Sequence, residues 1–417
     1  MPRTSLDAAA VRDQLARLSA VDEQVARRYP GASGARQPVH TCYVPADHVD
    51  AGVLRRWVDG ALRALDEHAA EPRDLAEVLG LDPALAELVH PRVRAKLAGS
   101  AVEDLRIDFE DGYGRRDDAV EDADAERVAA VVAGWTADGA QPANVGLRVK
   151  SFDDVRLRER SVRTLDVFLT NLLQEAGDLP DGFVLTFPKV VDAAQVEVFV
   201  DLLAALEDQL GLAPRSLRFE IQVETPQSVV DPQGRIALPR FLEAGAGRVT
   251  GLHFGTYDYT ASCGLTAANQ HLAHPACDFA RNVMQVSAAG TGVFLSDGST
   301  NVLPVGDQVH HGWRTHYELV RRSLRNGFYQ GWDLHPAQLV TRYAAVFAAF
   351  RESAPTEARR LADYASSRGG QVLDEPATAR GLAASFVRAL DGGAAEPAEI
   401  RELTGLGESE IRDLGRL

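Results

Sequence analysis

The residues in this sequence that could do chemistry are carboxylates that follow short apolar segments. Glu110 and Asp111 follow one such segment. Glu224 and Asp258 follow two later, consecutive ones. Crowded carboxylates repel one another unless they are protonated or bridged by a cation. Oxygen ligands favour Mg²⁺, Mn²⁺ or Ca²⁺ over zinc, and Mg²⁺ typically takes one or two carboxylates. We therefore expect Glu224 and Asp258 to bind Mg²⁺ or Mn²⁺.

Two cationic side chains lie in comparable positions. Arg148 ends the apolar segment NVGLRV, and Lys189 follows GFVLTF. Because an arginine can pair with a carboxylate through two parallel hydrogen bonds, Arg148 is the candidate for binding a substrate carboxylate. Lys189 is a second candidate for contacting the substrate, although a lysine directly after a proline is also typical of a structural role. Gly255 and Thr256, directly after the segment RVTGLHF, complete the predicted substrate-binding set.

This set of residues predicts metal-assisted chemistry on a small 2-oxo acid. A divalent cation would chelate the carboxylate and keto oxygens and stabilise an enolate as a Lewis acid. Arg148, Glu110 and Asp111 are the predicted catalytic residues within this part of the chain. Each of these side chains alone is also typical of an ion pair or a helix cap, and Asp111 in particular could be a cap.

The elements that must position these residues are short apolar runs that alternate with segments of helical spacing. Eight runs have the length of a buried strand, the last being the weakest: 40–44, 104–109, 144–149, 182–187, 217–223, 248–254, 291–295 and 329–334. Strands alternating with helices indicate a parallel sheet, and eight such units favour a closed (β/α)8 TIM barrel, an α/β fold. In that fold the candidates share one mouth, since they all follow strands. An open doubly wound sheet is the alternative, but no G-x-G-x-x-G or Walker A sequence occurs where it would be expected.

The flanks of the predicted barrel differ from its repeating part. We assign the barrel to residues 37–354, with a helical insertion at 66–100. Residues 1–36 form a predicted N-terminal helical extension. Residues 355–417 are too few to build a large core, so we expect a C-terminal helical lid that packs on a neighbouring barrel in a homo-oligomer.

Composition excludes several classes of partner. Among 417 residues, 44 are basic and 60 are acidic, which gives a net charge of −16. This balance argues against nucleic acid and anionic membranes as partners and is compatible with a small carboxylate substrate. Three cysteines do not form a disulfide framework, and no apolar run is long enough to span a membrane, so we expect a cytoplasmic protein.

The strand-end sequences also carry a family resemblance. The matching stretches run in order within residues 38–376: DFEDGYG (108–114), LRVKSF (147–152), FPKV (187–190), QVETPQSVVD (222–231), FGTYDYTASCGL (254–265) and GFYQGWDLHPAQL (327–339). The E-T and G-T-x-D motifs at consecutive strand ends, followed by His-Pro-x-Gln, are specific as a set. The chain resembles the HpcH/HpaI aldolase and citrate lyase β-subunit family of the phosphoenolpyruvate/pyruvate barrel superfamily.

The resemblance implies a Mg²⁺-dependent barrel enzyme in which Glu224 and Asp258 bind the metal and Arg148 binds the substrate carboxylate. It further implies that Asp374, in the stretch GGQVLDEP, enters a neighbour's site as acid or base. Members are commonly trimers or hexamers, and several act on coenzyme A thioesters. Two positions depart from the family pattern: Lys150 replaces an asparagine, and the pair 330–331 is Gln-Gly in place of Gly-Lys.

We therefore expect a Mg²⁺-dependent carbon–carbon lyase or aldolase acting on a 2-oxo acid or β-hydroxy acid, with or without a coenzyme A carrier. Two other readings stay open at this point. One is a phosphoenolpyruvate-type phosphoryl-transfer enzyme, which would use the same metal and arginine. The other is a ligand-binding barrel without catalytic activity.

Overall fold

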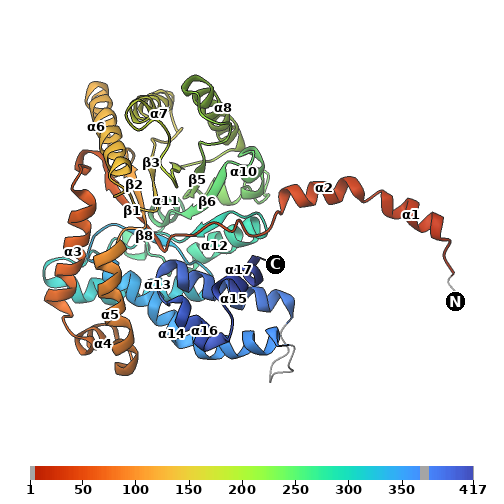
Figure 1. Cartoon of the computed structure of the whole chain (residues 1–417). Helices are drawn as coiled ribbons and strands as arrows, with labels where there is room; N and C mark the ends of the chain where they lie inside the picture. Colours follow the sequence, from red (N-terminus) through yellow and green to blue (C-terminus); the bar gives the residue numbers. More distant parts are fainter. Residues whose placement is uncertain (1–4, 367–374, 417) are drawn as a thin grey trace.

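Eight parallel strands form the centre of the molecule. The computed structural model describes residues 5–366 and 375–416. The strands are β1 (His40–Pro45), β2 (Asp104–Asp108), β3 (Asn144–Arg148), β4 (Leu185–Phe187), β5 (Phe219–Val223), β6 (Val249–Phe254), β7 (Phe294–Ser296) and β8 (Gly331–Asp333). They lie in the order β7-β6-β5-β4-β3-β2-β1-β8, and a parallel bridge between Ser296 and Gln330 brings the two ends together. The predicted (β/α)8 barrel is confirmed (Figure 1).

Helices surround the barrel and follow the strands in sequence. They are α3 (Val53–His68), α6 (Asp118–Ala137), α7 (Val155–Ala176), α8 (Ala193–Leu210), α9 (Pro226–Val229), α10 (Leu238–Ala244), α11 (Thr256–Ser262), α12 (Pro275–Ala288), α13 (Val309–Arg325) and α14 (Gln338–Ala365). Local sequence sets their ends. Asp192 and Gln195 form a capping box at the start of α8, and Gly211 ends that helix in the left-handed conformation.

The barrel has an apolar wall and a polar interior. Between the strands and helices, Phe187 stacks on Phe199 with ring centroids 4.4 Å apart. Inside the barrel, Arg106 lies 2.9 Å from Asp104 and 3.2 Å from Glu220. The buried charges are therefore paired, as burial requires.

Two further groups of helices pack against the barrel. Helices α4 (Pro72–Leu79) and α5 (Pro83–Ser100) occupy the predicted insertion. Helix α5 contacts α3 and α14, and α4 contacts α13. Helices α15 (Pro376–Gly392), α16 (Pro397–Thr404) and α17 (Glu408–Arg416) form the C-terminal region. Helices α15 and α16 pack on α14, and α17 packs on α15 and α16. This region lies at the amino ends of the strands: Gly392 approaches Val39, directly before β1. Its role as a lid on a neighbouring copy stays a prediction.

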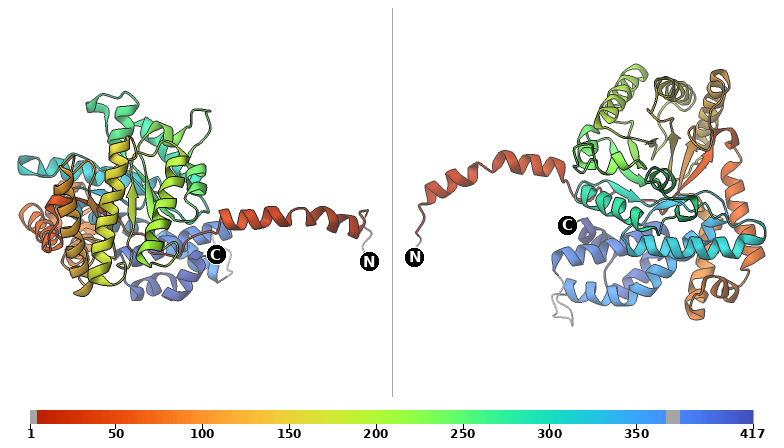
Figure 2. Two further views of the ribbon diagram at one scale, coloured as in Figure 1. Left: turned by 90° about the horizontal axis from the view of Figure 1, so that it is seen from above. Right: turned by 180° about the vertical axis from the view of Figure 1, so that it is seen from behind.

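The N-terminal segment leaves the body of the molecule as an arm. Helices α1 (Ala8–Ala16) and α2 (Ser19–Arg28) project away from the barrel in every view (Figures 1 and 2). The root of the arm is fixed by an ion pair between Arg28 and Glu243 and by a hydrogen bond from the Gly31 amide to the Gly290 carbonyl. No helix among the described residues is long and apolar enough to cross a membrane.

Candidate active site

The carboxyl ends of strands β2 to β6 bring the predicted site residues to one mouth of the barrel. Glu110 and Asp111 follow β2, and Arg148 ends β3. Lys189 follows β4, Glu224 follows β5, and Gly255, Thr256 and Asp258 follow β6. Parallel strands end at one edge, so residues far apart in sequence meet there.

Arg148 is held in place by Asp108, the last residue of β2. The Nε and Nη2 atoms of Arg148 donate to the two Asp108 carboxylate oxygens over 2.6 and 2.5 Å, and both side chains are buried. Asp108 also accepts from the backbone amides of Glu110 and Gly112, at 2.9 and 2.8 Å. A guanidinium group has five donors, so this pairing leaves donors for a ligand. Asp108 fixes the direction in which they point.

Lys189 lies between carboxylates from three strand ends. Its Nζ atom is 2.5 Å from Glu110, 2.7 Å from Asp111 and 3.7 Å from Asp258. Its backbone amide donates to Glu224 Oε1 over 2.8 Å. Lys189 adopts a φ of 52°, which is uncommon for a residue other than glycine. Strained backbone of this kind is frequent at functional sites, and here it turns both the amide and the ammonium of one residue toward the acids.

Glu224 is buried, and its surroundings leave little room beside it. A Cβ atom at Gly255 would lie 2.4 Å from Glu224 Cβ and 2.6 Å from Oε2, so glycine permits the observed position of the carboxylate. Thr256 begins α11 and is also buried. Within the described part of the chain, nothing hydrogen-bonds its Oγ1 atom. Asp258 lies in the first turn of α11, and 43% of its side chain is exposed.

Burial and like charges change the acidity of this cluster. Burial, opposed by Lys189 and reinforced by Glu110 and Asp258, raises the pKa of Glu224 to about 8. Burial also raises the pKa of Glu110 to about 7, although Arg148 and Lys189 oppose it. At Asp111, burial would raise the pKa, but the nearby Lys189 outweighs it and lowers the pKa. Two carboxyl groups at the mouth therefore change protonation near neutral pH.

These residues fit a divalent cation of the magnesium type. The donors are carboxylate and hydroxyl oxygens, and the carboxylates at the mouth outnumber its cationic side chains. Across residues 5–366 and 375–416, no three acidic, histidine or cysteine side chains gather closely enough to enclose a metal ion. A pair such as Glu224 and Asp258 suits Mg²⁺, which keeps several positions for water and substrate oxygens.

Comparison with known proteins places the chain in a family. The model of a family described as a domain of unknown function, DUF6986, matches residues 18–417. The chain belongs to the DUF6986 family. No curated protein sequence matches it.

The chain is also similar to several solved structures. A citrate lyase from Burkholderia xenovorans LB400 has 20% identity and a TM-score of 0.56, covering 89% of this chain and 98% of that one. A malate synthase from Haloferax volcanii in complex with magnesium and glyoxylate has 17% identity and a TM-score of 0.48, covering 91% and 97%. The protein CitE from Mycobacterium tuberculosis, in complex with magnesium, acetoacetate and coenzyme A, has 18% identity and a TM-score of 0.48, covering 86% and 99%. The first of these confirms the predicted resemblance at the level of the fold.

In this DUF6986 protein, the side chains of Lys150 and Gln330, which depart from the citrate lyase β-subunit pattern, do not reach the mouth of the barrel. Lys150 turns toward α6, where its Nζ atom lies 2.9 Å from Glu121 and donates to the Phe109 and Gly114 carbonyls. Gln330 lies at the amino end of β8 and donates to Thr41. Asp374, the predicted acid or base, lies outside the described residues.

The His-Pro-x-Gln element has a structural role. The Gln338 side chain accepts from the Leu334 and His335 amides, and His335 Nδ1 accepts from Ala337. The motif therefore shapes the turn from β8 into α14.

Two residues at the mouth were not predicted to have a role. Asp108 was visible as the first residue of DFEDG, but its pairing with Arg148 could not be deduced from sequence. Tyr43 on β1 lies beneath the Arg148 guanidinium, with its ring centroid 4.9 Å away, which favours a fixed cation. Its position as the next-to-last residue of the predicted strand 40–44 was the only signal for it.

Proposed function

We propose that this protein is a Mg²⁺- or Mn²⁺-dependent carbon–carbon lyase or aldolase acting on a 2-oxo acid or a β-hydroxy acid. The observation that carries the proposal is the gathering of Arg148, Lys189 and four carboxylates at one end of the barrel. A cation site beside a fixed arginine suits a substrate that carries a carboxylate next to a carbonyl group.

Arg148 would bind the substrate carboxylate. Asp108 accepts hydrogen bonds from Arg148 Nε and from one N–H of Arg148 Nη2, and Glu110 lies 3.4 Å from Arg148 Nη1. A substrate carboxylate would use the remaining donors. The Asp108 contact prevents the guanidinium from rotating, so less conformational entropy is lost when the substrate binds.

Glu224 and Asp258 would hold the metal ion, which when bound supplies Lewis-acid stabilisation of negative charge developing on a substrate oxygen. Lys189 would support this arrangement, because its backbone amide orients Glu224 and its ammonium neutralises Glu110 and Asp111. Gly255 and Thr256 would line the same position from β6.

Proton transfer would fall to Glu110, with Asp111 beside it. A pKa of about 7 lets Glu110 gain or lose a proton at neutral pH, as a general acid or base requires. Asp374 of a neighbouring copy is the second candidate for this role, and it would make the site dependent on a homo-oligomer, such as a trimer or a hexamer.

The test is a metal-dependent carbon–carbon cleavage or condensation assay. Purified protein with Mg²⁺ is incubated with pyruvate, oxaloacetate, glyoxylate and β-hydroxy acids, free and as coenzyme A thioesters, and products are followed by NMR. We expect turnover that chelation abolishes and that Glu224→Gln removes. The matched control is Glu352→Gln, which makes the same change in an ion pair on α14. Absence of product and of metal binding in the wild type would refute the proposal.

Phosphoenolpyruvate in the same panel separates the proposed lyase from a phosphoryl-transfer enzyme. The proposed lyase predicts that pyruvate, and not phosphoenolpyruvate, stabilises the protein against thermal unfolding in the presence of Mg²⁺. Stabilisation by phosphoenolpyruvate with release of phosphate would favour the other enzyme class.

A further inference from the structure

The N-terminal arm carries an apolar stripe that its own chain does not cover. Neither α1 nor α2 has a buried residue. Leu15, Leu18, Val21 and Val25 are each 49% to 59% exposed. Helices of 9 and 10 residues are marginal in water on their own, so an uncovered arm of this length needs a partner to stay helical.

The stripe is symmetric in sequence about Leu18. Leu15 and Val21 lie three residues on either side of it, and Val11 and Val25 lie seven residues on either side. Spacings of three and seven place side chains on one face of a helix. Leu18 lies in the turn between α1 and α2, where Arg17 (φ −63°, ψ −19°) and Leu18 (φ −81°, ψ −18°) keep right-handed helical angles that carry the stripe from one helix into the next. When two such stripes pair in opposite directions, Leu18 meets Leu18, Leu15 meets Val21, and Val11 meets Val25. The stripe is therefore complementary to a second copy of itself under a twofold axis.

The charges beside the stripe favour the same pairing. Asp7 caps the start of α1, and Arg28 lies in the last turn of α2. Antiparallel arms centred on Leu18 bring Asp7 of each copy beside Arg28 of the other. A parallel pair would instead set Asp7 beside Asp7 and Arg28 beside Arg28, and like charges repel.

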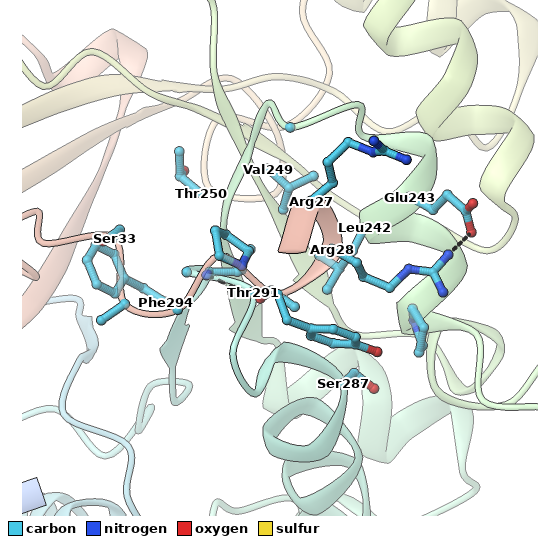
Figure 3. A pocket seen from close by; sticks show the side chains of 18 of the residues that line it. Arg27, Arg28, Ser33, Leu242, Glu243, Val249, Thr250, Ser287, Thr291 and Phe294 are labelled. Atoms are coloured by element: carbon cyan, nitrogen blue, oxygen red, sulfur yellow. Dashed lines mark hydrogen bonds and ion pairs between the residues drawn. The ribbon is translucent and has the colours of Figure 1, made fainter. Parts of the chain in front are cut away.

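A cavity at the root of the arm lies where the tip of a paired arm would end. It has a volume of about 810 Å³ and is lined by Arg28, Tyr29, Pro30 and Leu242, among others (Figure 3). In the antiparallel register, Leu6 of the second copy comes opposite Pro30. Leu6 is 73% exposed in its own chain, and the apolar side chains of this cavity offer it a place to bury.

We propose that the N-terminal arm is a dimerisation element: two copies of the chain pair their arms antiparallel about Leu18, and the tip of each arm docks in the cavity at the root of the other. The inference is independent of the proposed enzymatic function. A twofold arm contact would also join two trimers into a hexamer, since a hexamer of that kind needs both a threefold and a twofold contact.

Disulfide cross-linking of the full chain tests the direction of pairing. Cys263 is exposed and is first replaced by serine, whereas Cys42 and Cys277 are buried and stay. In that background, Leu18→Cys should form a covalent dimer under mild oxidation. Val25→Cys alone should not cross-link, but a mixture with Val11→Cys should. Self-cross-linking of Val25→Cys as efficient as that of Leu18→Cys would show parallel arms and overturn the proposal.

Sedimentation of the full chain over a range of concentrations tests whether the stripe drives association. Leu18→Asp sets two carboxylates across the axis and should raise the dissociation constant of the twofold contact by roughly 100-fold or more. The matched control is Leu88→Asp, which changes a leucine of α5 that is 57% exposed and should leave association unchanged. A wild-type chain that stays monomeric, or a Leu18→Asp variant that associates like the wild type, would overturn the proposal. The unfolding temperature of the barrel should be equal in the Leu18→Asp and Leu88→Asp variants, because Leu18 does not pack against the core.

Discussion

Replacing Gly255 by alanine tests whether the position of Glu224 determines metal binding. The alanine Cβ would lie 2.4 Å from Glu224 Cβ and 2.6 Å from its Oε2 atom, far inside ordinary contact distances. The backbone at Gly255 has φ −101° and ψ 97°, which alanine adopts without strain. The added methyl group therefore acts on Glu224 and not on the backbone.

The expected magnitude follows from the cost of overpacking. Inserting one methylene-sized group into a packed site costs typically about 1–3 kcal/mol. Moving the carboxylate away also breaks its hydrogen bond with the Lys189 amide, which contributes roughly 1 kcal/mol. If this combined cost of about 2–4 kcal/mol falls on the metal-binding position, the dissociation constant for Mg²⁺ rises roughly 30- to 700-fold, at roughly 1.4 kcal/mol per factor of ten.

Titration calorimetry with Mg²⁺ measures the effect, and circular dichroism checks that the barrel is intact. The matched control is Gly134→Ala on α6, where a Cβ atom meets nothing within 4 Å. Because alanine favours a helix over glycine by about 1 kcal/mol, this control should bind Mg²⁺ like the wild type and unfold at a slightly higher temperature. Wild-type affinity in Gly255→Ala would refute the assignment of Glu224 as a ligand.

Three further predictions concern the mouth and the wall of the barrel. Asp108→Asn removes the charge that fixes Arg148. It should raise the KM for a carboxylate substrate by roughly tenfold or more, with a smaller effect on kcat. An unchanged KM in steady-state kinetics would contradict the positioning role of Asp108. Because the pKa values of Glu224 and Glu110 are raised to about 8 and 7, the folded apo protein holds protons that an unfolded chain would release, so these groups stabilise the fold less as pH rises toward 8. Mg²⁺ needs the ionised carboxylates, so the rise in Tm that it causes should grow between pH 6 and 8, and a flat or opposite trend would argue against a carboxylate site. Gly146→Ala places a Cβ atom 1.6 Å from a backbone oxygen before β4 and should prevent folding to a soluble barrel, whereas a normal Tm would show that strands β3 and β4 can separate.

The barrel and its mouth could be predicted because the chemistry follows the strands. Each predicted site residue within the described chain lies just after, or at the end of, an apolar run, and parallel strands bring those ends together. Lys150 shows where this reasoning fails. Counting alternate residues along a strand would set Lys150 on the same side as Arg148. Strand β3 ends at Arg148, so the chain turns and Lys150 pairs with Glu121 outside the mouth.

Other features depend on long-range contacts that a single sequence does not reveal. The N-terminal extension was expected to be helical, but only the structure shows that it leaves the barrel and exposes Leu18. Asp108 could equally have been a helix cap, because its pairing with Arg148 joins residues 40 positions apart. In both cases the residue type was visible and its partner was not.

The layers of the barrel interior differ in how their charges are balanced, and that difference explains why the mouth suits a cation. Deep inside, burial raises the pKa of Asp104, while burial of Glu220 is outweighed by Arg106, which lowers its pKa to about 2. Arg106 lies 2.9 Å from Asp104 and 3.2 Å from Glu220, so these interior acids are balanced by a cation of the chain itself. At the mouth, Glu224 and Glu110 have raised pKa values near neutrality, and the nearby Asp258 is partly exposed to solvent. The excess of acid there can be balanced in two ways, by protons at low pH or by a divalent cation at higher pH, and only the second leaves the carboxylates ionised.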